Sequence, residues 1–206
     1  MKAPKGDEYS ELVETSLMQT AGALKSFSSY GTAEVLKAAE MIAASMAQGG
    51  KLLLCGNGGS AADCQHMAAE FVCRLSKKRE RKALPAIALT TDTSFLTAFA
   101  NDYCFEDVFA RQVEALGRPG DVLLGISTSG GSENVNRAIA TAGRLGLVTV
   151  ALTRRGGRSG AIADAALEVD SEDTAVIQNV HLAVEHILCA IVEDLLLGGD
   201  AAGSRE

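Results

Sequence analysis

A histidine and a glutamate, His66 and Glu70, stand four residues apart just after the glycine-rich stretch CGNGGS, residues 55–60. Four residues make about one turn of an α-helix, so the imidazole and the carboxylate would lie on one face of a helix that follows this stretch. Side by side in a pocket, the two groups could move protons between neighbouring atoms of a bound molecule. The same spacing is also typical of a pair that only stabilises an exposed helix, and this alternative stays open.

Two short stretches rich in glycine and serine could bind an anion. GNGGS, residues 56–60, and STSGGS, residues 127–132, each join an apolar run to a helical segment. Glycine lets the backbone approach a ligand, and the free amides at a helix start favour negative charge. Neither stretch matches GxxxxGK[ST] or GxGxxG, which disfavours a nucleotide, and tight turns without a ligand are the alternative. The second stretch adds hydroxyl donors, namely Ser127, Thr128, Ser129 and Ser132.

The elements that must hold these groups follow from the apolar pattern. Short apolar runs alternate with helical segments of ten or more residues, which is typical of a parallel sheet with helices on both faces. The sequence therefore predicts a doubly wound, flavodoxin-like α/β fold with ligands beyond the carboxyl ends of five parallel strands. An N-terminal helical hairpin, 7–30 and 32–48, precedes the sheet, and a long helix, 174–197, follows it. The expected strands are 52–55, 86–89, 122–126, 148–152 and 166–169.

Length, charge and cysteine usage limit the class of protein. The 206 residues suit one domain, 1–206, with an α/β core over about 51–197, and we expect a disordered tail at 198–206. A formal net charge of -7 disfavours nucleic acid as a partner, and the basic run 77–82 is expected to be a solvated loop. Five cysteines without a CxxC pair favour a reducing compartment, and no apolar run approaches the roughly 20 residues of a membrane span. We therefore expect a cytoplasmic protein without a membrane anchor.

Three stretches together resemble a known family. They are CGNGGS, DVLLGISTSG at 121–130, and PAIALTTDTSFLTAFANDY at 85–103. In this combination the chain resembles the sugar isomerase (SIS) domain and, within it, the phosphoheptose isomerase family, from about residue 12 to residue 197. The resemblance implies isomerisation of D-sedoheptulose 7-phosphate to D-glycero-D-manno-heptose 7-phosphate through an enediol. That reaction is the first step of ADP-heptose biosynthesis, which serves surface glycans such as lipopolysaccharide.

The resemblance also implies roles for individual residues. The catalytic pair would be Glu70 and His186, the latter within IQNVHLAVEHIL at 177–188, where the residues alone favour an ordinary core histidine. No role falls on His181. The implied ligands of a zinc ion, one per subunit, are His66, Glu70, Gln178 and His186. The implied substrate-binding residues are Asn57, Gly58, Gly59, Ser60, Glu70, Arg74, Asn101, Asp102, Ser127, Thr128, Ser129, Ser132 and Gln178.

Three positions leave details open. Arg74, one turn beyond Glu70, could touch substrate, orient Glu70 or form a plain surface salt bridge. The family usually has asparagine at the position of Gly131 and TG where this chain has TRR, residues 153–155. These departures concern the phosphate side and the rim of the pocket.

Spacing on the last helix predicts a site shared between subunits. Gln178 and His186 are eight residues apart, about 12 Å along a straight helix, which is too far for both to hold one ion from the same helix. One or more pocket residues should therefore come from a neighbouring copy in a homo-oligomer, which the resemblance makes a tetramer. The N-terminal helices and the apolar stripe of the last helix are the expected contact surfaces.

A scaffold protein is the alternative function. One relative of these isomerases binds the bacterial replication initiator without known catalysis. It lacks the acidic residue at the position of Glu70 and the histidine at the position of His186. Both are present here, which favours the enzyme.

Overall fold

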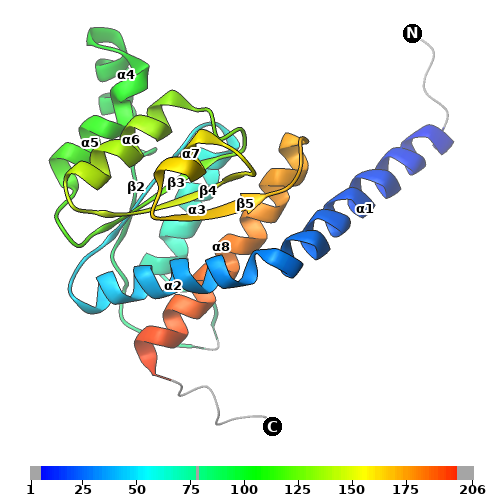
Figure 1. Cartoon of the computed structure of the whole chain (residues 1–206), viewed down its shortest axis with the longest axis horizontal. Helices are drawn as coiled ribbons and strands as arrows, with labels where there is room; N and C mark the ends of the chain where they lie inside the picture. Colours follow the sequence, from blue (N-terminus) through cyan, green and yellow to red (C-terminus); the bar gives the residue numbers. More distant parts are fainter. Residues whose placement is uncertain (1–5, 78, 199–206) are drawn as a thin grey trace.

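A five-stranded parallel sheet forms the centre of the protein in the computed structural model, which describes residues 6–77 and 79–198 (Figure 1). The strand order is β2-β1-β3-β4-β5, which is the flavodoxin-like arrangement, and the predicted fold class is confirmed. Each predicted strand boundary agrees with the structure to within two residues. The strands are β1 (Leu52–Gly56), β2 (Ala86–Ala88), β3 (Val122–Ser127), β4 (Val148–Arg154) and β5 (Ala165–Val169).

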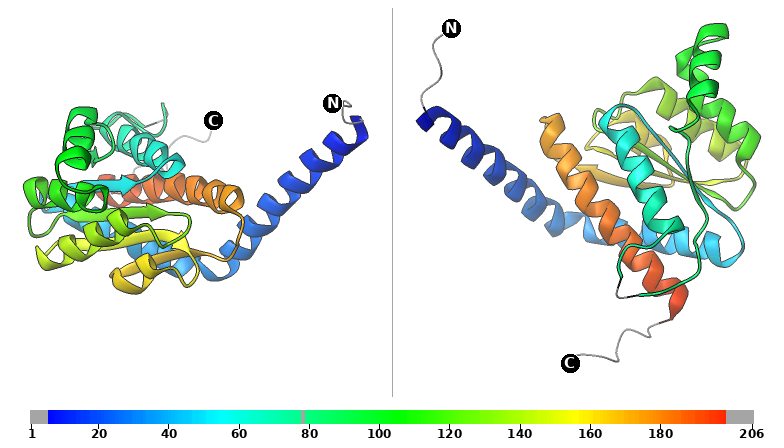
Figure 2. Two further views of the ribbon diagram at one scale, coloured as in Figure 1. Left: turned by 90° about the horizontal axis from the view of Figure 1, so that it is seen from above. Right: turned by 180° about the vertical axis from the view of Figure 1, so that it is seen from behind.

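Helices cover both faces of the sheet. One hydrophobic core joins α2, α3 and α8 to the first face, and a second joins α5 and α6 to the other (Figures 1 and 2). The helices are α1 (Gly6–Tyr30), α2 (Thr32–Ala47), α3 (Gly59–Val72), α4 (Thr93–Asp102), α5 (Val108–Leu116), α6 (Glu133–Arg144), α7 (Arg158–Ile162) and α8 (Thr174–Leu197), with a 3-10 turn η1 (Phe105–Asp107).

Alternation along the central strands explains why their sequences are apolar throughout. Leu52 and Leu54 pack into the core under α2, α3 and α8, whereas Leu53 and Cys55 pack into the core under α5 and α6. Successive residues of a strand point to opposite faces, and here both faces are covered. β1 and β3 are therefore buried at every position.

The two N-terminal helices do not fold back on each other, which corrects the predicted hairpin. Gly31 between them has φ of -84° and ψ of -13°, close to helical values. Hydrogen bonds from Gly31 N to Phe27 O and from Val35 N to Gly31 O, at 2.8 and 3.0 Å, carry the helical pattern across the junction. α1 therefore continues α2 as a bent rod and projects from the body, with Leu12 and Leu17 exposed (Figure 2).

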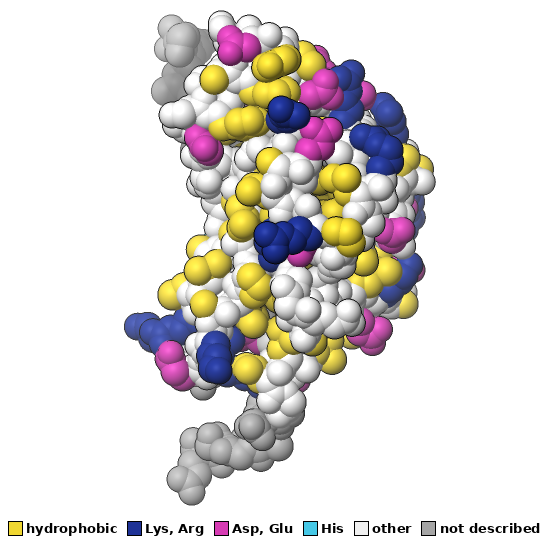
Figure 3. Space-filling model, turned by 90° about the vertical axis from the view of Figure 1, so that its left-hand side faces the viewer, with side chains coloured by type: hydrophobic (Ala, Val, Ile, Leu, Met, Phe, Trp, Pro, Cys, Tyr) yellow, Lys and Arg dark blue, Asp and Glu magenta, His cyan; other side chains and the backbone are white. Residues whose placement is uncertain are grey.

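Helix α4 lies at the edge of the second core, because none of its residues is fully buried although Phe95, Leu96 and Phe99 pack against that core. Phe95, Phe99 and Tyr103 stack along it, with ring centroids 5.4 and 4.8 Å apart. Figure 3 views the molecule from the left-hand side of Figure 1, and apolar side chains lie there among charged ones. Tyr103 is 75% exposed, so this end of the molecule presents aromatic surface.

The segment after α3 corrects a second expectation. The basic run 77–82 is not a uniformly solvated loop, because the Arg81 side chain is only 1% exposed and pairs with Glu193 of α8. The predicted tail lies outside the described residues except for Gly198, which ends α8 with φ of 58°. Among the described residues, no helix combines the length and the apolar character needed to cross a membrane.

Candidate active site

The two glycine-rich loops meet at the carboxyl edge of the sheet. β1 and β3 are neighbours, and their last paired residues are Gly56 and Ile126. Just beyond, the side-chain amides of Asn57 and Asn134 bind each other through two reciprocal hydrogen bonds of 2.8 Å. The loop after β1 is thereby tied to the start of α6, as the sheet topology predicts for ligand-binding loops.

The first loop leads directly into α3. Gly58 has φ of 55°, which a residue with a side chain rarely adopts, and Gly59 begins the helix beside Gln178 of α8. A Cβ atom at Gly59 would lie 2.2 Å from Nε2 of Gln178, so the Gln178 side chain would have to move to admit one. Gln178 donates a hydrogen bond of 3.1 Å to Asp63, and Ser60 is buried in the first turn of α3.

Hydroxyl groups gather in the second loop. The Oγ atom of Ser127 lies 3.0 Å from that of Ser132 and 3.5 Å from that of Ser129. Thr128, which lies between Ser127 and Ser129 in the sequence, is half-buried. Ser132 immediately precedes α6. The three serines therefore form one cluster of hydroxyl groups before a helix start, with Thr128 next to them in the chain, which is a suitable place for a phosphate.

Backbone packing fixes the shape of this loop. Gly130 has φ of 65°, and a Cβ atom there would lie 2.5 Å from Cα of Gly157, in the loop after β4. A side chain at Gly130 would therefore be strained in its own conformation and would collide with its neighbour. Gly131, which replaces the family's asparagine, has room for a side chain, because a Cβ atom would meet only Ser129 at 3.7 Å.

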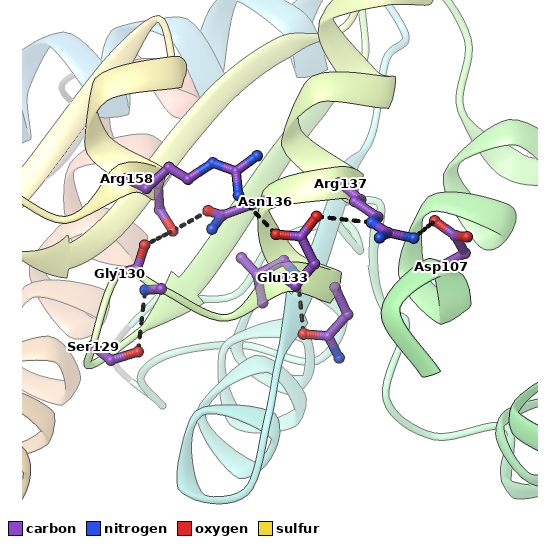
Figure 4. Close-up of polar contacts among 11 residues, drawn as sticks. Asp107, Ser129, Gly130, Glu133, Asn136, Arg137 and Arg158 are labelled. Atoms are coloured by element: carbon purple, nitrogen blue, oxygen red, sulfur yellow. Dashed lines mark hydrogen bonds and ion pairs between the residues drawn. The ribbon is translucent and has the colours of Figure 1, made fainter. Parts of the chain in front are cut away.

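A row of alternating charges flanks the hydroxyl cluster (Figure 4). Glu133, the first residue of α6, accepts hydrogen bonds from Arg137 at 2.8 Å and from Arg158 at 2.7 Å, and Arg137 also reaches Asp107 at 3.0 Å. The hydrogen bond from Arg137 is the main cause that lowers the pKa of Glu133. The paired carboxylate therefore adds little net negative charge beside a helix start that could hold an anion.

Helices α3 and α8 bring three predicted residues together. Nε2 of His66 lies 3.0 Å from Nε2 of His186 and 3.5 Å from Oε1 of Glu70. One possible ligand atom from each of the three residues lies within 4.8 Å of the others. Oε2 of Glu70 is buried and has no hydrogen-bond partner among the described residues. The cluster can move protons, and its nitrogen and oxygen atoms could hold a divalent metal ion.

Other predicted residues lie elsewhere in the single chain. Gln178 contacts α3 at Asp63, and it is two helical turns from His186 along α8. Asn101 and Asp102 are exposed at the end of α4 and hydrogen-bond to each other at 2.8 Å. Arg74 pairs with Glu80 at 2.8 Å on the surface, which is the plain salt bridge that the sequence left open.

The two arginines of the TRR stretch, at the end of β4, bind the loop that follows β5. Arg154 forms an ion pair with Glu172, and Arg155 donates to Asp170 at 2.6 Å. The Arg155 guanidinium also lies 4.2 Å from the centre of the Tyr30 ring, a favourable cation–π contact. Both arginines therefore help to order the segment that leads into α8.

His181 and Glu185 are two of the ionisable groups that are buried on α8. Burial lowers the pKa of His181 to about 4, although the backbone of Thr153 acts in the opposite direction. Burial raises the pKa of Glu185 to about 8, and the charge of Asp63 adds to this. Both side chains are therefore mainly uncharged near pH 7.

Sequence reasoning missed several residues of this region. Asn134 and Glu193 are two examples, since each acts through a partner more than 70 positions away. Asp63 carried a usable signal, because it stands three residues before His66 on the same helical face. Arg81 lies in a basic run, a pattern that favours an exposed side chain, so nothing in the sequence indicated that it is buried.

Comparison with known proteins places the chain in a family. The SIS domain family matches residues 17–154. The phosphoheptose isomerase of Maridesulfovibrio salexigens is 53% identical over 173 residues, which cover 84% of this chain and 82% of that protein. The phosphoheptose isomerase of Roseiflexus sp. is 57% identical over 163 residues, which cover 79% of this chain and 82% of that protein.

Solved structures give the same result. The phosphoheptose isomerase GmhA from Neisseria gonorrhoeae superimposes with a TM-score of 0.84 at 42% identity, covering 90% of this chain and 99% of that one. A phosphoheptose isomerase from Francisella tularensis has a TM-score of 0.85 at 34% identity, covering 89% and 97%. This protein belongs to the SIS domain family and, within it, to the phosphoheptose isomerases.

Proposed function

We propose that this protein isomerises D-sedoheptulose 7-phosphate to D-glycero-D-manno-heptose 7-phosphate through an enediol. The observation that carries the proposal is the meeting of Glu70 and His186, which come from different helices and lie beside His66. A carboxylate and an imidazole next to a bound ketose supply the proton transfers that an aldose-ketose isomerase needs. Membership in the phosphoheptose isomerases identifies the sugar.

Each member of the pair has a different proton to move. Glu70 transfers the proton between C1 and C2 of the sugar, and His186 gives and takes the proton at the oxygen. The side chain of Glu70 is 15% exposed, so its carboxylate is partly shielded from water. Partial exclusion of water strengthens its interactions with the reacting atoms.

The rest of the substrate would extend along the sheet edge. Its phosphate binds the hydroxyl cluster at the start of α6, formed by Ser127, Thr128, Ser129 and Ser132. The sugar lies along the first loop, next to Asn57, Gly58, Gly59 and Ser60. Asn101, Asp102 and Gln178 complete the contacts. The phosphate end is thereby anchored while the other end of the sugar faces the proton-transfer pair.

A divalent ion, zinc by resemblance to the family, fits the same place. His66, Glu70 and His186 offer two imidazoles and one carboxylate, and the buried Oε2 of Glu70 needs a partner. Gln178 is the fourth ligand that the resemblance implies. When bound, such an ion polarises the carbonyl and stabilises negative charge on the enediolate.

A homotetramer with shared active sites completes the proposal. Asn101 and Asp102 are carried on α4, at the edge of the second core, and Gln178 is two turns from His186. Leu12 and Leu17 of α1, with Ile187 and Leu195 of α8, are 48–66% exposed and give apolar surface for subunit contacts. One site would then draw side chains from neighbouring copies.

The cellular setting follows from the chemistry of the chain. All five cysteines are free thiols, which suits the cytoplasm. The net charge of -7 gives no reason to expect nucleic acid as a partner. The product would enter ADP-heptose synthesis and then surface glycans such as lipopolysaccharide.

The assay is direct. Purified protein is incubated with sedoheptulose 7-phosphate, and aldose product is followed by NMR. We expect turnover by the wild type and a loss of about 10²–10⁴-fold in Glu70→Gln, because the acid-base group is removed. Glu114→Gln, an exposed glutamate on α5, is the control and should leave the rate unchanged. No turnover by the wild type with zinc present, together with binding of the replication initiator, would favour the scaffold instead.

A further inference from the structure

Arg81 joins the end of α3 to α8 in a buried contact. Its side chain is 1% exposed, and Nε donates to Oε1 of Glu193 at 2.6 Å. Nη2 donates to the backbone carbonyl of Glu70 at 2.7 Å, and Nη1 donates to that of Phe71 at 2.8 Å. One guanidinium therefore holds the last turn of α3 and a carboxylate of α8 together.

Physical chemistry explains why an arginine occupies this position. The last carbonyl groups of a helix lack partners within the helix, and a cation near this end is favoured by the helix dipole. The side chain of Glu193 is 5% exposed, so its carboxylate needs a buried partner. Nη2 of Arg81, 2.5 Å from Oε1 of Glu193, is that partner. The planar guanidinium can serve carbonyls and carboxylate at once, which a lysine ammonium cannot.

The contact joins the two helices that carry the proton-transfer pair. On α3, Arg81 holds the carbonyl of Glu70 itself. On α8, Glu193 follows His186 by seven residues, two turns along the same face. Toward the start of both helices, Gln178 of α8 donates to Asp63 of α3 at 3.1 Å. The two helices are thus joined by Gln178 and Asp63 on one side of the cluster and by Arg81 and Glu193 on the other.

We propose that Arg81 is a positioning residue, which with Glu193 sets the placement of Glu70 relative to His186. This inference rests on the proposed function. Arg81 does not touch the reacting atoms, and it acts through the backbone of Glu70. The hydroxyl cluster lies before α6, beside the loop that precedes α3, whereas Arg81 holds the last turn of α3, so binding of the phosphate does not depend on this contact.

Conservative variants test the proposal. Arg81→Lys keeps the charge but loses the simultaneous bonds to carbonyls and carboxylate, and Glu193→Gln keeps the shape but loses the charge. Because removal of one partner alone strands a buried charge, Arg81→Met with Glu193→Leu removes both. The matched control is Arg79→Lys, since Arg79 belongs to the same segment and pairs with Asp194 of α8 at 2.7 Å on the surface.

The expected signature is a separation of kcat from KM. We expect kcat to fall about 10-fold to 100-fold in Arg81→Lys and in the double variant, as for a displacement of about 1 Å. KM for sedoheptulose 7-phosphate should change less than about threefold, and Arg79→Lys should match the wild type. Affinity for Zn²⁺ alone, measured by calorimetry, should fall in the same variants. A folded double variant with wild-type kcat and zinc affinity would overturn the proposal, as would a change confined to the melting temperature.

A structural readout separates this inference from the proposed function. If the wild type forms no aldose, the proposed function fails, whereas the role of Arg81 is then judged from crystal structures. We expect the distance between Oε1 of Glu70 and Nε2 of His186 to change between the wild type and the double variant. An unchanged distance would reject the positioning role.

Discussion

The Nε2 atoms of His66 and His186 lie 3.0 Å apart, although 120 positions separate the two residues in the chain. Either one ring donates a hydrogen bond to the other, or both nitrogens face a common cation. The carboxylate of Glu70 lies 3.5 Å from His66, so a cation between the rings would also meet a negative charge. A metal ion can therefore be tested on this cluster independently of any substrate.

Zinc should bind the cluster at about one ion per subunit. After treatment with EDTA, calorimetric titration with Zn²⁺ should show this site in the wild type. His66→Gln removes a ligand and should weaken binding by more than the 10-fold to 100-fold that loss of an outer partner costs. Gln65→Ala, at the exposed neighbouring position, should bind as the wild type does. Equal affinities in His66→Gln and the wild type would remove this cluster from consideration as the metal site.

The fold could be predicted from the sequence because its signals are local. Apolar runs of four or five residues between helical segments mark strands buried on both faces, and β1 and β3 have this burial. The angle between α1 and α2 could not be predicted, since Gly31 can adopt either a turn or a helical conformation. Here it is nearly helical, and the expected hairpin becomes a rod.

The candidate site was only partly visible in the sequence. His66 and Glu70 are neighbours on one helix, so their proximity follows from spacing. His186 could be placed beside them only through the resemblance to a family. The burial of Arg81 depends on Glu193, 112 positions away, and nothing in the basic run indicates this partner.

Gly130→Ala should damage phosphate binding. The new Cβ atom would lie 2.5 Å from Cα of Gly157, and a positive φ of 65° costs a residue other than glycine about 1–2 kcal/mol. The loop must shift, so we expect KM for the sugar phosphate to rise at least about 10-fold. Gly131→Ala is the matched control, because its Cβ atom meets only Ser129 at 3.7 Å. Equal KM values for the two variants would show that the shape of the loop is unimportant for binding.

Asp121 should stabilise the fold above pH 4. It is 3% exposed, and although burial acts to raise its pKa, hydrogen bonds from Lys51 and from the amide of Arg118 lower it overall. A lowered pKa in the folded state contributes stability that is present above the unfolded pKa of about 3.9 and is lost as the pH falls. Asp121→Asn should therefore cost about 1–3 kcal/mol in urea unfolding at pH 7, and less at pH 3.

A surface carboxylate provides the comparison for Asp121. Asp194 is 58% exposed in its side chain and pairs with a partly exposed arginine, so Asp194→Asn should cost less than about 1 kcal/mol at either pH. If Asp121→Asn has an equally small effect, the buried contacts of Asp121 do not stabilise the fold.

His181 should lower the free energy of unfolding in mild acid. Its pKa is about 4 in the folded state, below the ordinary value of 6.5, because burial disfavours the imidazolium. The unfolded chain therefore takes up a proton between pH 6.5 and 4 that the folded chain does not, and stability falls as the pH falls through this range. His181→Leu removes this proton uptake. At each pH the free energy of unfolding in urea is measured for the variant and for the wild type. The variant's value minus the wild type's should rise by about 2 kcal/mol as the pH falls from 7.5 to 5.

Glu185 changes the pH dependence of stability in the opposite direction, so both proteins in the comparison must contain it. Its pKa of about 8 in the folded state lies above its ordinary value, so it stabilises the folded protein below pH 4.5, and this contribution is lost as the pH rises toward 8. Comparing His181→Leu with the wild type at equal pH cancels this contribution. A difference between the two proteins that stays constant from pH 7.5 to 5 would mean that His181 titrates alike in the folded and unfolded states, and is therefore hydrated rather than buried.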